Sequence, residues 1–67
     1  MRLKKLGQRI RALRNDRGMS LLQLSEDTGL SKGHLSDIEN GKKNMTITTL
    51  WKILESLDIN VGKLLEE

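Results

Sequence analysis

The pattern of apolar and polar positions along the chain predicts helices throughout. Near the N-terminus, Leu3, Leu6, Ile10 and Leu13 recur at spacings of three and four, which places one apolar stripe along a helix. No stretch alternates apolar and polar residues convincingly with the period of two that a half-buried strand shows. The pattern therefore favours an all-α fold.

Capping residues and glycines divide the chain into five expected helices. Ser20 followed by Gln23 has the form of a capping box, in which each residue satisfies a backbone N–H of the other. The expected N-caps are Ser20, Ser31, Thr46 and Asn60. The glycines at which helices are expected to end are Gly18, Gly29 and Gly41. The expected helices cover residues 3–16, 21–28, 32–40, 47–57 and 61–66.

Only Gly29 and Leu30 separate the second expected helix from the cap of the third. So short a link with a glycine forces a sharp angle between the two helices, which is the helix-turn-helix unit. On a helical wheel the third helix buries Leu35 and Ile38. Its other side and shoulder carry small or hydrogen-bonding residues: Lys32, Gly33, Ser36, Asp37 and Asn40. Such a face suits base edges and phosphates, although a short polar surface helix would look the same.

Composition narrows the class of protein. A chain of 67 residues is expected to form one small domain, 1–67. It contains no cysteine and one histidine, so disulfides and thiolate metal sites are excluded, and His34 cannot hold a metal by itself. No apolar run approaches the roughly 20 residues that span a bilayer. We therefore expect a cytoplasmic protein that has no membrane segment, no metal and no cofactor.

The positive charge is unevenly distributed. The net charge is +3, and residues 1–18 hold seven Lys or Arg residues against one Asp. Basic residues cluster again at Lys42 and Lys43. A basic domain is compatible with a nucleic-acid partner, but a solvated protein surface can have the same composition.

Residues 17–42 carry a family resemblance. They contain the segment 35–42, LSDIENGK, and the chain continues with TITTL at 46–50. Together these segments resemble the phage-repressor-like, Xre-type helix-turn-helix family of bacterial and phage regulators, and the resemblance covers nearly the whole chain. It implies a five-helix bundle of the lambda-repressor-like DNA-binding type. In such a domain the third helix enters the major groove, and two copies bind a palindromic operator as a homodimer.

The resemblance also implies roles for individual residues. Those expected to face base edges are Lys32, Gly33, Ser36 and Asp37. Those expected to contact phosphates are Ser20, Ser31, Asn40, Lys42, Lys43 and Asn44. Asp37 departs from the family pattern, so it either accepts a hydrogen bond from cytosine or points away from DNA. Arg14 and Glu39 are expected to form a structural ion pair between the first and third helices, unless Arg14 is simply solvated.

The fourth expected helix has more apolar surface than a small domain can bury. Its core stripe is expected to contain Ile47, Leu50, Leu54 and Leu57. Ile53 and Trp51 widen this stripe to about 200°, whereas a surface helix needs roughly 100°. Trp51 either lies flat over the edge of the core or packs against a second copy. The expected dimer interface contains Ile47, Trp51, Val61 and Leu65.

Two functions remain open. The leading one is a sequence-specific double-stranded-DNA-binding transcription regulator, with repression favoured. The alternative is an antitoxin or a restriction–modification controller whose main partner is another protein. We do not expect an enzyme, because the sequence has no nucleophile–base pairing, metal-ligand cluster or glycine-rich phosphate loop. The chain begins with Met1 and ends soon after the fifth expected helix, as a complete short protein would, whereas a fragment would leave room for further domains.

Overall fold

The computed structural model describes the backbone of residues 3–65 and the side chains of residues 3–64. The helices are α1 (Leu3–Asp16), α2 (Leu21–Thr28), α3 (Lys32–Glu39), α4 (Ile47–Ser56) and α5 (Val61–Leu65). Within these residues there is no strand, so the predicted all-α fold with five helices is confirmed. Helices α3 and α4 each end one residue earlier than predicted, and Glu66 lies outside the described residues.

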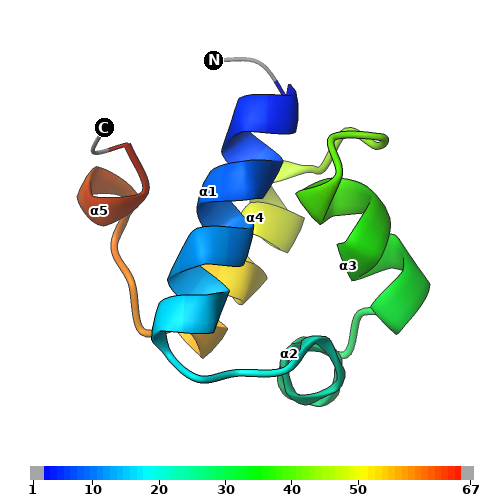
Figure 1. Ribbon diagram of the computed structural model, residues 1–67, viewed down its shortest axis with the longest axis horizontal. Helices are drawn as coiled ribbons and strands as arrows, with labels where there is room; N and C mark the ends of the chain where they lie inside the picture. The colour runs from blue at the N-terminus through cyan, green and yellow to red at the C-terminus, as the bar shows by residue number, and fades with distance from the viewer. Residues whose placement is uncertain (1–2, 66–67) are drawn as a thin grey trace.

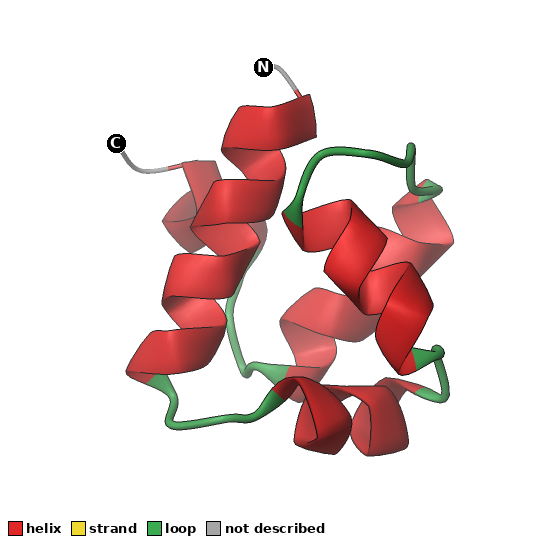
Figure 2. Ribbon diagram, turned by 45° about the vertical axis from the view of Figure 1, so that its right-hand side comes forward, coloured by secondary structure: helices red, strands yellow, loops and turns green. Residues whose placement is uncertain are grey.

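Helix α1 forms the centre of the arrangement. Figure 1 shows α3 on one side of α1 and α5 on the other, with α4 behind α1. Helix α3 packs against α1 and α2, while α2 also packs against α4 and α5 packs against α1. Figure 2 shows the short link that joins α2 to α3. Because α3 is supported from behind by two helices, its remaining side faces outward.

One hydrophobic core joins the five helices. Leu35 and Ile38, the two positions of α3 predicted to be buried, are part of it. The core residues are Ile10, Leu13, Leu24, Leu35, Ile38, Ile53, Leu54, Leu57, Ile59 and Leu64. In the described part of the chain, the helices are too short or too polar to cross a membrane.

The buried stripe of α4 differs from the predicted one. Ile47, predicted in the core, is 86% exposed, whereas Ile53, predicted at the edge of the stripe, is fully buried. Spacing alone allows either a stripe that starts at Ile47 or one that runs through Leu50, Ile53, Leu54 and Leu57. Packing of α4 against α2 selects the second, and Ile47, the first residue of the helix, lies outside it.

Local signals explain where the helices begin and end. The Ser20 hydroxyl accepts a hydrogen bond from the Gln23 N–H at 3.0 Å, and Gln23 Oε1 accepts one from the Ser20 N–H at 2.7 Å. The predicted capping box is therefore present. Gly18, Gly29 and Gly41 all have a positive φ, as helix-ending glycines do. After α4 the same role falls to Asp58, whose φ is 56°.

Candidate nucleic-acid interface

Side chains fix the turn between α2 and α3. The Thr28 hydroxyl donates to the Leu24 carbonyl at 2.7 Å and accepts from the Leu30 N–H at 3.2 Å. The Ser25 hydroxyl donates to the Leu30 carbonyl at 2.5 Å. Gly29 supplies the left-handed conformation, with φ 75°. These bonds pair the N–H and carbonyl of Leu30 with side chains of α2, and so fix the angle at which α3 leaves the turn.

The outward face of α3 is accessible to a partner. Lys32 and Gly33 are exposed, and Ser36 and Asp37 are partly exposed. A Cβ atom added at Gly33 would meet nothing within 4 Å, so the backbone here is open to close approach. The structure thus presents all four residues predicted to read bases on the surface of one helix.

Two serine hydroxyls stand at the starts of the two helices. Ser20 caps α2, and Ser31 caps α3 by accepting a hydrogen bond from the His34 N–H at 3.0 Å. A hydroxyl that accepts in this way still has its own O–H to donate. Both serines are exposed, so each can donate to an anionic oxygen in front of a helix N-terminus, where the dipole favours negative charge.

The loop after α3 carries the predicted phosphate-binding lysines. The Gly41 N–H donates to the Ile38 carbonyl at 3.1 Å, and the Lys42 N–H donates to the Asp37 carbonyl at 2.9 Å. This pair of bonds is a Schellman motif, which fixes where the chain leaves the helix. The exposed residues that follow are Lys42, Lys43 and Asn44. Their side chains start from a defined backbone at the end of α3.

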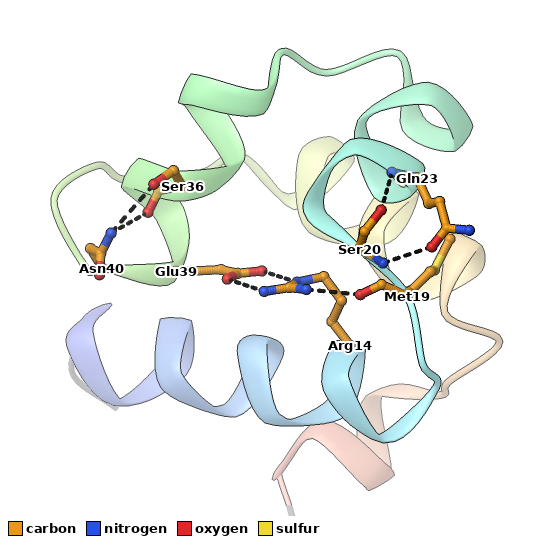
Figure 3. A network of polar contacts seen from close by, with 7 residues as sticks. All are labelled: Arg14, Met19, Ser20, Gln23, Ser36, Glu39 and Asn40. Carbon is orange, nitrogen blue, oxygen red and sulfur yellow. Dashed lines mark hydrogen bonds and ion pairs between the residues drawn. The ribbon is translucent and has the colours of Figure 1, made fainter.

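Asn40 is more constrained than predicted. Its Nδ2 donates to the Ser36 carbonyl at 2.9 Å and lies 3.5 Å from the Ser36 hydroxyl (Figure 3). The amide group is therefore folded back along α3, although Asn40 is exposed. A contact between its Nδ2 and a phosphate requires this bond to be shared or replaced.

Asp37 and Lys43 contact each other. The Lys43 Nζ lies 3.7 Å from the Asp37 Oδ2, and the two side chains are 54% and 38% exposed, respectively. An ion pair this accessible to water contributes little to stability, about 0–1 kcal/mol. Its effect is on the charge of the surface, because the carboxylate on the outward face of α3 offsets the charge of a lysine in the loop.

A buried ion pair ties α3 to α1. The Arg14 Nε and Nη2 atoms donate to the two carboxylate oxygens of Glu39, at 2.7 and 3.0 Å, and Nη1 donates to the Met19 carbonyl at 2.8 Å (Figure 3). Both residues of the pair are buried. The hydrogen bond to Glu39 raises the pKa of Arg14 above its ordinary value, desolvation opposes this, and the charge of Glu39 adds to it. Arg14 is thus held as a cation by the residue predicted to pair with it.

Sequence reasoning missed the role of Gly7. A Cβ atom at this position would clash with the Ile38 carbonyl oxygen and would lie 2.6 Å from the carbonyl oxygen of Glu39. The backbone of α1 therefore touches the C-terminal end of α3 directly. An isolated glycine inside a regular helix is the available signal, because it is unfavourable there unless packing requires it.

The apolar residues predicted at a dimer interface lie outside the core. Ile47, Trp51 and Val61 are exposed, while the side chain of Leu65 lies outside the described residues. Trp51 and Val61 line a pocket of about 390 Å³ between α4 and α5, which is also lined by Glu55 and Asp58. Trp51 is 61% exposed, so more than half of its surface is accessible to a partner.

These features define a class of protein: an all-helical domain whose helix-turn-helix presents an accessible polar face beside a basic loop. No group of three metal-ligating side chains occurs among the residues searched, which are those that the structure describes. The model of the helix-turn-helix family matches residues 10–64. The chain belongs to this family, and the Xre-type resemblance and the fold class are confirmed. The family consists of DNA-binding regulators and not of enzymes.

Proteins similar in sequence to this chain include a transcriptional regulator and a phage repressor. The chain is 43% identical over 63 residues to the transcriptional regulator SinR of Bacillus subtilis, covering 92% of this chain and 57% of SinR. It is 37% identical over 62 residues to the immunity repressor protein of Bacillus phage phi105, covering 92% of this chain and 43% of the repressor. The chain thus spans about half the length of these relatives.

A solved structure of similar length has the same fold. The restriction-modification controller protein C.AhdI from Aeromonas hydrophila matches with a TM-score of 0.88 and 34% sequence identity. The match covers 92% of this chain and 94% of that chain. The five-helix arrangement is therefore shared over nearly the full length of both chains.

Proposed function

We propose that this chain regulates transcription, most simply as a repressor, by binding a specific double-stranded DNA site with α3 in the major groove. The observation that carries the proposal is the outward face of α3, which is accessible while its other side is fixed to α1 and α2. The major groove of B-DNA admits one α-helix and displays a distinct pattern of donors and acceptors for each base pair. The residues assigned to base edges are Lys32, Gly33, Ser36 and Asp37.

A second set of residues is assigned to the DNA backbone. The hydroxyls of Ser20 and Ser31 stand at helix N-termini, and the loop lysines follow directly on α3. The residues assigned to phosphates are Ser20, Ser31, Asn40, Lys42, Lys43 and Asn44. Phosphate contacts position a protein on the duplex and supply salt-dependent affinity, whereas base contacts supply sequence preference.

The proposed active form is a homodimer on a palindromic site. Exposed apolar side chains on α4 and α5 support this, because Ile47, Trp51 and Val61 are 86%, 61% and 47% exposed, respectively. The proposed interface also includes Leu65. A two-fold interface uses the same patch on both copies and would place two α3 helices on two half-sites.

A second candidate is the controller of a restriction–modification locus. The supporting observation is that the controller protein C.AhdI has the same fold and nearly the same extent as this chain. A protein partner such as a toxin is a further alternative, for which the uncovered apolar surface of α4 is the available docking area. These candidates share DNA binding and differ in the gene they regulate or the protein they contact.

Selection of bound sequences from random duplex DNA tests the proposal. We expect an enriched half-site repeated in inverted orientation, because two copies of α3 are related by a two-fold axis. Recovery of a single unrepeated half-site would contradict the homodimer. A pool that shows no enrichment would contradict sequence-specific binding itself.

A further inference from the structure

The N-terminal end of α1 lies against the basic loop that follows α3. A Cβ atom added at Gly41 would lie 2.5 Å from the Lys4 Cα and 2.9 Å from the Lys4 Cβ, so the two backbones touch. Lys42 and Lys43 come next in the chain. Packing thus brings a lysine from the start of the sequence to lysines nearly forty positions away.

Lys4 is one of four residues that follow a single edge of α1. Lys4, Gly7, Arg11 and Arg14 are spaced by three, four and three residues, which places them in one row along the helix. The other members show where this row points. Gly7 touches the end of α3 and Arg14 bonds Glu39, so the row faces α3. Arg11 lies between these two contacts.

Lys4 and Arg11 are the two cations of this row that form no ion pair with α3 among the described residues. Both are exposed, and among residues 3–64 neither has an acidic group within ion-pair distance. The nearby acids are committed elsewhere, because Glu39 binds Arg14 and Asp37 contacts Lys43. Like charges held together by packing repel one another, and a polyanion laid across them relieves the repulsion.

We propose that Lys4 and Arg11 of α1 form an additional contact with the phosphate backbone of DNA, continuous with the loop lysines. The inference rests on the proposed function, since it extends the same DNA-binding surface from α3 and its loop onto α1. Lys4 and Arg11 are separated by two turns of helix, about 10 Å, which is more than the spacing of successive phosphates on one strand. They therefore contact different phosphates.

The test is the salt dependence of binding by the full chain to a fluorescein-labelled duplex of mixed sequence. Lys4→Gln and Arg11→Gln each remove one positive charge from α1. Lys52→Gln removes the same charge from α4, where Lys52 lines a separate pocket with Asp27 and Glu55, and serves as the matched control. Fluorescence polarisation over a series of salt concentrations gives the slope of log K against log salt for each variant.

We expect Lys4→Gln and Arg11→Gln each to reduce the magnitude of the slope by about 0.9, the value for one phosphate contact on duplex DNA. Between about 50 and 200 mM salt this makes the loss of affinity roughly three- to four-fold smaller than for the unmodified chain. Lys52→Gln should leave the slope unchanged. Melting curves followed by circular dichroism should coincide for all variants, because the substituted side chains are exposed.

The outcomes separate this inference from the proposed function. If the unmodified chain shows salt-dependent binding but Lys4→Gln and Arg11→Gln have the same slope as Lys52→Gln, the contact with α1 is overturned and the proposed function stands. An effect of only one substitution overturns the proposal for the other residue. If the unmodified chain shows no salt-dependent binding to duplex DNA, the proposed function fails and this inference fails with it.

Discussion

Arg14 donates two hydrogen bonds to the carboxylate of Glu39, so that a side chain of α1 binds a side chain in the last turn of α3. The same guanidinium donates a third bond to the Met19 carbonyl, just before α2 begins. One residue of α1 therefore contacts the end of α3 and the entry to α2. This places both helices of the helix-turn-helix relative to a common support.

Removing one partner of this pair should destabilise the domain strongly. Arg14→Met leaves the Glu39 carboxylate buried without a partner, and such a loss costs about 3–5 kcal/mol. A chain of this size has only about 3–10 kcal/mol of stability in total. We expect urea denaturation to show a large loss for Arg14→Met and a smaller loss for the double variant Arg14→Met/Glu39→Leu. Equal losses for the single and double variants would contradict the role of the pair.

The contribution of Arg14 should not vary with pH near neutrality. Its pKa is raised on folding, so its contribution is fully present below the ordinary value for arginine and is lost only as the pH rises through the higher folded value. Both values lie in the strongly alkaline range. The difference in unfolding free energy between the unmodified chain and the double variant Arg14→Met/Glu39→Leu, in which no buried carboxylate is left without its partner, should therefore not vary through Arg14 titration between about pH 6 and pH 9. Urea denaturation at several pH values would reveal an Arg14 titration there if this assignment is wrong.

Gly7→Ala should separate α1 from α3. The added Cβ would meet main-chain oxygens of Ile38 and Glu39, which cannot rotate away as a side chain could. Overpacking of this kind costs about 1–3 kcal/mol, and the displaced α3 should bind DNA more weakly. Thermal unfolding followed by circular dichroism and a binding titration measure the two effects.

Gly33→Ala is the matched comparison for Gly7→Ala. A Cβ at Gly33 would meet no atom within 4 Å, so alanine should stabilise α3 by about 0.5–1 kcal/mol. If the backbone of Gly33 approaches a base pair, the same methyl group should weaken binding to the selected site. A variant that melts higher and binds DNA equally well would exclude such a close approach.

Much of the fold was predictable because its signals are local. Ser20 and Gln23 form their capping box within one turn, and the glycine that follows α2 needs only its own conformation to end the helix. The stripe of α4 was not fixed in this way. Whether Ile47 or Ile53 is buried depends on how α4 meets α2, and spacing alone cannot decide it.

Only the part of the candidate site that lies within one helix could be predicted from the sequence. The outward face of α3 follows from the helical period, which is a property of one helix. The position of Lys4 beside Gly41 depends on contacts between distant parts of the chain. The pairing of Asp37 with Lys43 depends on the path of the loop after α3, for which the sequence has no comparable signal.

Asp37→Asn should increase affinity for DNA of mixed sequence and reduce discrimination. The substitution removes a negative charge from the proposed DNA face and releases Lys43 from its partner. Both changes strengthen the attraction between this surface and the phosphates of DNA, whatever the base sequence. If Asp37 also accepts a hydrogen bond from cytosine, the amide should weaken preference for that base, a difference of about 1–3 kcal/mol for a good contact. Parallel titrations with the selected site and a mixed-sequence duplex measure the ratio, and an unchanged ratio would show that Asp37 does not read a base.

Ile47→Glu should stabilise the single domain while it breaks the proposed dimer. Ile47 is the first residue of α4 and lies outside the core, so its replacement leaves no cavity. The first turn of α4 contains no acidic residue, and a carboxylate there interacts favourably with the helix dipole by about 0.3–1 kcal/mol. At a two-fold interface the same substitution places two carboxylates on an apolar surface, which opposes association.

Leu22→Glu is the control, because Leu22 is an exposed apolar residue in the first turn of α2. Sedimentation over a range of protein concentrations should show Ile47→Glu as a monomer at concentrations where the unmodified chain and Leu22→Glu are dimers. Urea denaturation at low concentration should show that neither variant has lost stability. If Ile47→Glu sediments as a dimer, the two copies associate through another surface; if Leu22→Glu alone dissociates, that surface includes α2.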